Sequence, residues 1–152
     1  MRYYTGVGSR QTPIAVQKMM TSIAEHLVNL RFTLRSGGAI GADQAFERGA
    51  KEKEIYYATD TTEAAEQIAS KIHPNWGACD RLSRGYHGRN VLQVLGRDLH
   101  TPSEFVVCWT KEGKAVGGTR TAIMVAAENG IPVFNLAKPE ILPQLETFLN
   151  TL

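Results

Sequence analysis

Hydrophobic and polar positions follow two periods along the chain, one typical of strands and one typical of helices. Short apolar runs rich in β-branched and aromatic residues predict five strands, at residues 3–7, 32–34, 55–57, 105–109 and 133–135. Apolar residues that recur three and four positions apart predict helices after Pro13, over 42–53, over 64–72, from residue 91 to 99, over 121–129 and from residue 141 to the end. Thr61 or Thr62 is expected to cap the third of these helices.

The alternation of strands and helices predicts the fold class. It indicates an α/β domain, a Rossmann-like three-layer domain with a mainly parallel sheet and helices on both faces. The run at 105–109 is the most hydrophobic, so we expect it to be the central strand. Residues 73–86 break the pattern and are expected to form a long loop. No repeat or linker interrupts the chain, so residues 1–152 are expected to form one domain.

Three glycine-rich segments each follow a predicted strand and precede a predicted helix. We call them the first glycine loop (residues 6–10), the second glycine loop (36–43) and the third glycine loop (116–121). Ligands of open parallel sheets bind beyond the carboxyl ends of the strands. We therefore expect the three loops to converge at one edge of the sheet.

The chemistry of these loops favours an anionic ligand. Glycine lets the backbone approach a phosphate closely, and a following helix offers free N–H groups and a partial positive charge. A tight turn also uses glycine for steric reasons, so each loop taken singly has a structural interpretation too. The residues expected to bind a ligand or its phosphate are Gly8, Ser9, Arg10, Ser36, Gly37, Gly38, Gly41, Asp43, Arg89, Asn90, Gly117, Gly118, Thr119 and Arg120.

Three arginines and one carboxylate have specific expected roles in this site. Arg10, Arg89 and Arg120 would supply charge-assisted contacts to phosphate. Asp43 has two interpretations, a contact to a ribose or a structural carboxylate in the first turn of a helix. Arg89 and Asn90 are placed in the segment 87–90, which is expected to open the helix after the long loop.

Composition and charge limit the alternatives. The chain carries 17 basic and 15 acidic residues, a net charge of +2, which is low for a protein that binds nucleic acid over its whole surface. Residues 71–98 are more basic, with five cations against two carboxylates and with Trp76 and Tyr86 interleaved, a pattern that suits single-stranded nucleic acid or merely a solvated loop. The two cysteines, Cys79 and Cys108, are too few for a disulfide framework, and neither lies in a metal-binding spacing, so we expect no metal. We expect no cofactor either.

No segment has the apolar length of a membrane span or the pattern of a signal peptide. We therefore expect a cytoplasmic protein without a membrane partner.

The motifs GSRQTP, SGGAIGAD, GRN and GGTRTA occur in the order found in the SLOG superfamily, which the chain resembles over nearly its whole length. This superfamily includes the Lonely Guy (LOG) nucleotide phosphoribohydrolases and the core of DNA-processing protein A (DprA). The first two loops and the pair Arg89-Asn90 are more similar to the DprA branch. That resemblance implies single-stranded DNA binding in recombination.

The LOG branch implies hydrolysis of nucleoside monophosphates, with Arg89 matching its catalytic arginine. The third glycine loop departs from the LOG motif, because Met124 stands where the motif has its glutamate. Methionine cannot stabilise an oxocarbenium ion or assist a water molecule, and Glu128 one turn further along is a poor substitute. The sequence therefore favours a protein without this hydrolase activity.

Three functions remain, in this order. The first is binding of a nucleotide or nucleotide-derived small molecule at the glycine loops. The alternative is DprA-like binding of single-stranded DNA at the same edge, and the second alternative is the phosphoribohydrolase. The apolar C-terminal helix and the SLOG resemblance also predict a homo-oligomer.

Overall fold

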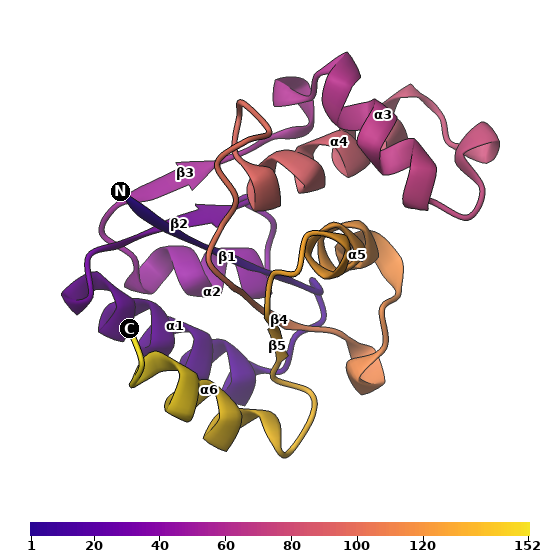
Figure 1. The fold of residues 1–152 in the computed structure, drawn as a ribbon. Coiled ribbons are helices and arrows are strands. Elements are labelled where there is room, and N and C mark those ends of the chain that lie inside the picture. The colour runs from indigo at the N-terminus through magenta and orange to yellow at the C-terminus, as the bar shows by residue number, and fades with distance from the viewer.

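A computed structural model describes residues 1–152 and joins five strands into one parallel sheet. The strands are β1 (Arg2–Gly8), β2 (Phe32–Ser36), β3 (Lys53–Ile55), β4 (Val106–Trp109) and β5 (Val133–Asn135), and their order across the sheet is β3-β2-β1-β4-β5 (Figure 1). Every neighbouring pair is parallel. Along the chain, β2 and β3 are added on one side of β1, and β4 and β5 are then added on its other side. The switch point between these directions lies between β1 and β4.

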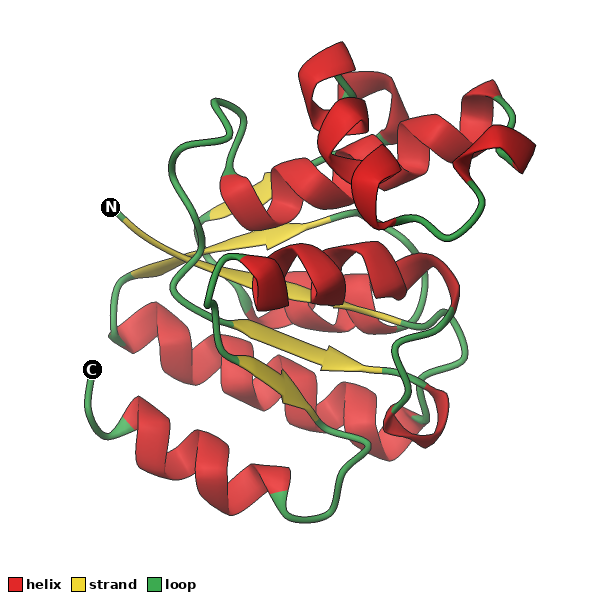
Figure 2. Cartoon of the chain, turned by 45° about the vertical axis from the view of Figure 1, so that its right-hand side comes forward, coloured by secondary structure: helices red, strands yellow, loops and turns green.

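Helices cover both faces of this sheet, which confirms the predicted three-layer α/β architecture. The helices α1 (Ile14–Asn29), α2 (Ala42–Gly49) and α6 (Ile141–Leu149) pack on one face, and α4 (Arg81–Leu95) and α5 (Arg120–Glu128) pack on the other (Figures 1 and 2). Helix α3 (Glu63–Ile72) lies on the same side as α4 and α5 and packs against those two helices. The pleat of β4 shows the division, because Val107 joins the first core while Val106 and Cys108 join the second. None of these helices has the length and apolar character that crossing a membrane requires.

The prediction of a long loop over residues 73–86 is wrong from Arg81 onward, where the structure has a helix. Helix α4 begins at Arg81 because the Asp80 side chain accepts a hydrogen bond from the Ser83 N–H at 2.8 Å and caps the helix. It ends at Leu95, so residues 87–90 lie in the middle of the helix and do not open it. The first half of the predicted loop holds only the short 3₁₀ helix η2 (Trp76–Ala78).

Two smaller expectations are also corrected, and the expected cap of α3 is confirmed as one of the two predicted threonines. The central strand is β1, and β4 lies between β1 and β5. Helix α2 ends at Gly49, and β3 begins at Lys53, two residues before the predicted start of the strand. Thr62, not Thr61, caps α3 by accepting the Ala65 N–H at 3.1 Å. The remaining 3₁₀ helices are η1 (Ala58–Asp60), η3 (Lys111–Gly113) and η4 (Gly117–Thr119).

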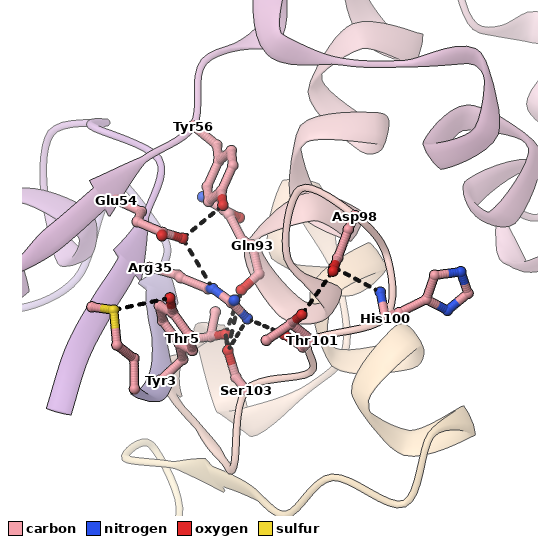
Figure 3. Close-up of polar contacts among 11 residues, drawn as sticks. Tyr3, Thr5, Arg35, Glu54, Tyr56, Gln93, Asp98, His100, Thr101 and Ser103 are labelled. Atoms are coloured by element: carbon pink, nitrogen blue, oxygen red, sulfur yellow. Dashed lines mark hydrogen bonds and ion pairs between the residues drawn. The ribbon is translucent and has the colours of Figure 1, made fainter.

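A buried arginine ties the β2–β3 edge of the sheet to the segment that precedes β4 (Figure 3). Arg35 is 2% exposed, and its guanidinium donates to the Thr101 carbonyl at 2.6 Å and to Glu54 Oε1 at 3.2 Å. Its other face covers the Tyr3 ring at 3.8 Å. The charge is therefore paired and hydrogen-bonded, as a buried charge must be.

Candidate functional site

The three glycine loops meet at the carboxyl edge of the sheet, as the sequence predicts. At Gly41, φ is +88°, and a Cβ there would lie 2.7 Å from the Ser9 carbonyl oxygen and 2.8 Å from the Arg10 Cα. Only glycine therefore lets the second loop pack against the first. Asn90 of α4 donates from Nδ2 to the Gly118 carbonyl at 2.6 Å, which fastens the third loop to the same edge.

A cavity of about 790 Å³ opens between the loops that follow β1 and β4, at the switch point of the sheet. This volume is within the usual range for small-molecule sites. Nine of the residues predicted for the site line it, namely Gly8, Ser9, Arg10, Asp43, Arg89, Asn90, Gly117, Gly118 and Thr119.

The other five predicted residues do not line the cavity. These are Ser36, Gly37, Gly38, Gly41 and Arg120. The Glu47 carboxylate of α2 accepts both the Ser36 hydroxyl at 2.7 Å and the Gly38 N–H at 3.0 Å, so the donors expected to cradle a phosphate are bound within the protein. Arg120 points elsewhere and donates to the carbonyl of Ile72 at 2.9 Å.

Asp43 is buried at the start of α2 beside the cavity. Its Oδ2 accepts the Ala39 N–H at 3.3 Å, so the carboxyl braces the second glycine loop. Burial raises the pKa of Asp43 to about 7, against the lowering effect of Arg89. Near neutral pH this carboxyl therefore exists in both protonated and ionised forms.

Arg89 projects from the middle of α4 between the second and third loops. Its Nη1 donates to the Gly37 carbonyl at 3.0 Å and its Nε to Asn90 Oδ1 at 3.0 Å, whereas Nη2 has no hydrogen bond within the protein. The guanidinium also lies 5.2 Å from the centre of the Tyr86 ring. Burial lowers the pKa of Arg89, but the side chain stays charged because arginine starts from so high a value. Arg89 thus positions a loop and keeps one free donor group.

The mouth of the cavity is electropositive. Arg10 and Lys111 are exposed cations on its lining, and neither forms a salt bridge. Asp43 is the one carboxylate that lines the cavity, and its raised pKa reduces its negative charge near pH 7. This surface therefore favours an anionic ligand.

Sequence reasoning missed Gln93, which lines the cavity from α4. It is 1% exposed, yet neither its amide nitrogen nor its amide oxygen has a hydrogen-bond partner. A buried amide without partners is costly unless water or a ligand satisfies it. One polar residue within the apolar run 91–95 was the signal that could have found it.

Besides Arg89, three of the five cations in the basic segment at 71–98 contact side chains or carbonyls within the protein. Arg81 pairs with Glu66, and Arg97 lies 3.9 Å from Asp60. Arg84 covers the Trp76 ring at 5.2 Å and donates to the Trp76 carbonyl at 3.1 Å. These cations are therefore less available to a nucleic acid than Arg10 and Lys111.

Comparison with known proteins finds a similar fold. No protein-family model matches the chain, and no curated protein matches it either. Among solved structures, the chain is similar to DNA processing protein A from Helicobacter pylori, with a TM-score of 0.63 and 16% sequence identity. The match covers 99% of this chain and 79% of that one. The description of the Helicobacter pylori structure concerns the way in which that protein binds single-stranded DNA. The chain therefore shares the Rossmann-like fold of a DNA processing protein.

Proposed function

We propose that the chain binds single-stranded DNA, with one nucleotide unit of the strand held in the cavity at the switch point. The observation that carries this proposal is that two cations without a salt bridge, Arg10 and Lys111, line the cavity together with Tyr86. Cations beside an exposed aromatic ring suit a strand whose phosphates need charge and whose bases need a stacking surface.

Each of these side chains has a role in the proposed complex. Arg10 and Lys111 contact the phosphates on either side of the bound nucleotide. Tyr86 is 38% exposed and offers a ring on which a base can stack. The unpartnered Gln93 amide offers both a donor and an acceptor, which matches the edge of a base.

This proposal reverses the order that the sequence favours, in which a small nucleotide comes first. Its support comes from the free cations at the cavity mouth and from the fold shared with a protein described as binding single-stranded DNA. Membership of the SLOG superfamily is part of the same proposal.

In the proposed complex, Ser36, Gly38 and Arg120 do not contact the DNA. Their polar groups form hydrogen bonds within the protein, so these residues have a structural role at the carboxyl edge of the sheet.

Binding of a free nucleotide is the second candidate. The cavity volume and the buried Gln93 amide favour it, because a small ligand could fill the one and satisfy the other. The phosphoribohydrolase ranks third, since neither Met124 nor Glu128 lines the cavity.

Fluorescence anisotropy with a labelled oligothymidylate tests the proposal and separates these candidates. We expect Arg10→Ala and Lys111→Ala to weaken oligonucleotide binding by roughly tenfold each, because each removes a charge-assisted contact. Lys114→Ala is the matched control, since Lys114 pairs with Glu112 and lies outside the cavity. Thymidine monophosphate should compete only weakly. Equal affinity for the mononucleotide and the oligonucleotide would support the second candidate instead.

A further inference from the structure

Three potential metal ligands lie together beside the cavity, although they are far from a recognisable spacing in the sequence. His73 follows the last residue of α3, Cys79 follows η2, and His87 lies in α4. One ligand atom from each side chain lies within 4.8 Å of the other two. The fold therefore assembles a group that the order of residues along the chain does not reveal.

The distances fit tetrahedral coordination after a small closure. The Cys79 Sγ lies 3.6 Å from His73 Nε2. Typical zinc–sulfur and zinc–nitrogen bonds in a tetrahedron separate these two atoms by about 3.6 Å and two imidazole nitrogens by about 3.3 Å. The thiol and the first imidazole thus already have the required separation. The remaining ligand atoms are within 4.8 Å, so their separations need to shorten by about 1.5 Å or less. The His73 ring must also turn to aim Nε2 at the ion, because the Cys79 Sγ lies 3.9 Å from Nδ1 as well.

Hydrogen bonds orient one of the two imidazoles toward such an ion. The Nδ1 of His87 lies 2.7 Å from the Thr121 hydroxyl oxygen. In the tautomer whose Nδ1–H donates to that oxygen, Nε2 presents its lone pair, which is the usual outer-shell arrangement of a metal-binding histidine. At His73, the Asn75 N–H donates to Nδ1 at 3.0 Å. Coordination through Nε2 transfers the ring proton to Nδ1, so this hydrogen bond opens.

The surroundings leave one coordination position facing the cavity. His73 and His87 both line the cavity, whereas Cys79 does not, so the thiol is the ligand furthest from it. The Trp76 ring packs against both imidazoles, with ring centres 6.0 Å from His73 and 6.1 Å from His87. An ion among the three ligands would therefore be shielded by Trp76 and open toward the cavity.

We propose that His73, Cys79 and His87 bind one divalent transition-metal ion, with Zn²⁺ as the ion that best fits one thiolate and two imidazoles. Binding replaces the S–H bond of Cys79 by a sulfur–metal bond, and the thiol proton goes to solvent. Three protein ligands leave the fourth tetrahedral position to water. The ion also links the segment 73–80 to α4. This proposal does not depend on the proposed function, because it needs no nucleic acid.

Titration of the metal-free, reduced full-length protein with Co²⁺ and Zn²⁺ tests the site. We expect one ion per chain, and the Co²⁺ form should show the strong visible absorption of a tetrahedral site together with a thiolate-to-metal charge-transfer band. Zn²⁺ should displace Co²⁺, and binding should raise the midpoint of thermal unfolding. Wild-type protein that gains no such bands at a molar excess of Co²⁺ contradicts the proposal without recourse to any variant.

Variants assign the ligands. Cys79→Ser should abolish the charge-transfer band, and His73→Ala and His87→Ala should each weaken Zn²⁺ binding by at least a hundredfold. Thr121→Val should weaken it by roughly tenfold to a hundredfold, because it removes only the orienting hydroxyl. His100→Ala is the matched control, since His100 is exposed and belongs to no metal-ligand group. Circular dichroism checks that each variant folds. A thiolate-to-metal charge-transfer band that persists in folded Cys79→Ser would overturn the assignment.

Discussion

Asp43 shows how one buried side chain can make stability depend on pH. Its pKa rises from 3.8 to about 7 in the folded protein, chiefly through burial. The folded state therefore binds this proton more tightly than the unfolded chain does. The resulting stabilisation is complete below about pH 4 and is lost as the pH rises through about 7.

Replacing Asp43 by asparagine should remove this dependence. Between about pH 5 and pH 8, the wild-type free energy of unfolding should fall by more than that of Asp43→Asn, by up to roughly 3 kcal/mol. Histidines that titrate in the same range act on both proteins, so the difference isolates Asp43. Urea unfolding of both proteins at the two pH values measures it. Equal changes in the two proteins would show that burial does not raise this pKa.

At the scale of residues, the sequence locates the site better than it assigns roles within it. Glycine after a strand identified the converging loops, and Gly41 shows the reason, since its φ of +88° and its contact with the first loop exclude a side chain. The direction of a polar group was not predictable in this way. Ser36 donates a hydrogen bond to Glu47, which lies eleven positions further along the chain, and no sequence pattern links these two residues.

Helix α4 supplies six of the residues that line the cavity, and its glycines explain why the sequence pattern did not predict the first part of this helix. Gly85 and Gly88 lower helix propensity and weaken the apolar pattern at 81–90. In the structure they let neighbouring segments approach closely. A Cβ on Gly88 would collide with the Thr61 hydroxyl and lie 2.9 Å from Glu66 Cγ. Tertiary packing thus determines a helix that local propensity disfavours.

An alanine at Gly88 should therefore destabilise the protein, although alanine favours helix. We expect Gly88→Ala to lower the free energy of unfolding by about 1–3 kcal/mol, because the collision outweighs the propensity gain of about 1 kcal/mol. Gly77→Ala is the matched control, since nothing lies within 4 Å of a Cβ at Gly77. Chemical denaturation measures both changes. A Gly88→Ala protein as stable as the control would contradict the close packing of α3 and α4.

Elements preceded by proline or glycine were predictable, because these turn residues mark where the next element begins. The last strand was predicted at 133–135, as β5 has it, and the terminal helix at the same starting residue as α6. Strand order was not predictable from local patterns. The most hydrophobic run became β4 beside the centre, because a strand with one neighbour on each side and helices on both faces is as buried as the central one.

Across the whole molecule, the net charge of +2 does not reveal how the positive charge is distributed over the surface. The basic segment is mostly paired internally, while Arg10 and Lys111 remain free at one edge of the sheet. The homo-oligomer stays a prediction. Helix α6 buries Ile141 and Leu145 against its own sheet, so its apolar face alone no longer argues for a partner subunit.

Oligonucleotide binding at the carboxyl edge of the sheet should weaken as the salt concentration rises, and the steepness of this dependence reports the number of phosphate contacts. The slope of log affinity against log salt concentration should fall in magnitude by about 0.7 for each phosphate contact removed from a single strand. Arg10→Ala and Lys111→Ala should each show this reduction, and the double variant should show about twice as much. Anisotropy titrations over a series of salt concentrations provide the slopes. An unchanged slope in the double variant would place the phosphate contacts elsewhere.

Amide chemical shifts, followed during titration with a short oligothymidylate, locate the bound strand on the protein without any substitution. We expect the largest shifts in residues 8–11, in residues 110–119 and around Tyr86, and the side-chain amide of Gln93 should also shift as it gains a partner. The network around Arg35 and helix α6, which do not line the cavity, should change little. Largest shifts in that network or on α6, with the glycine loops unaffected, would contradict the proposed site.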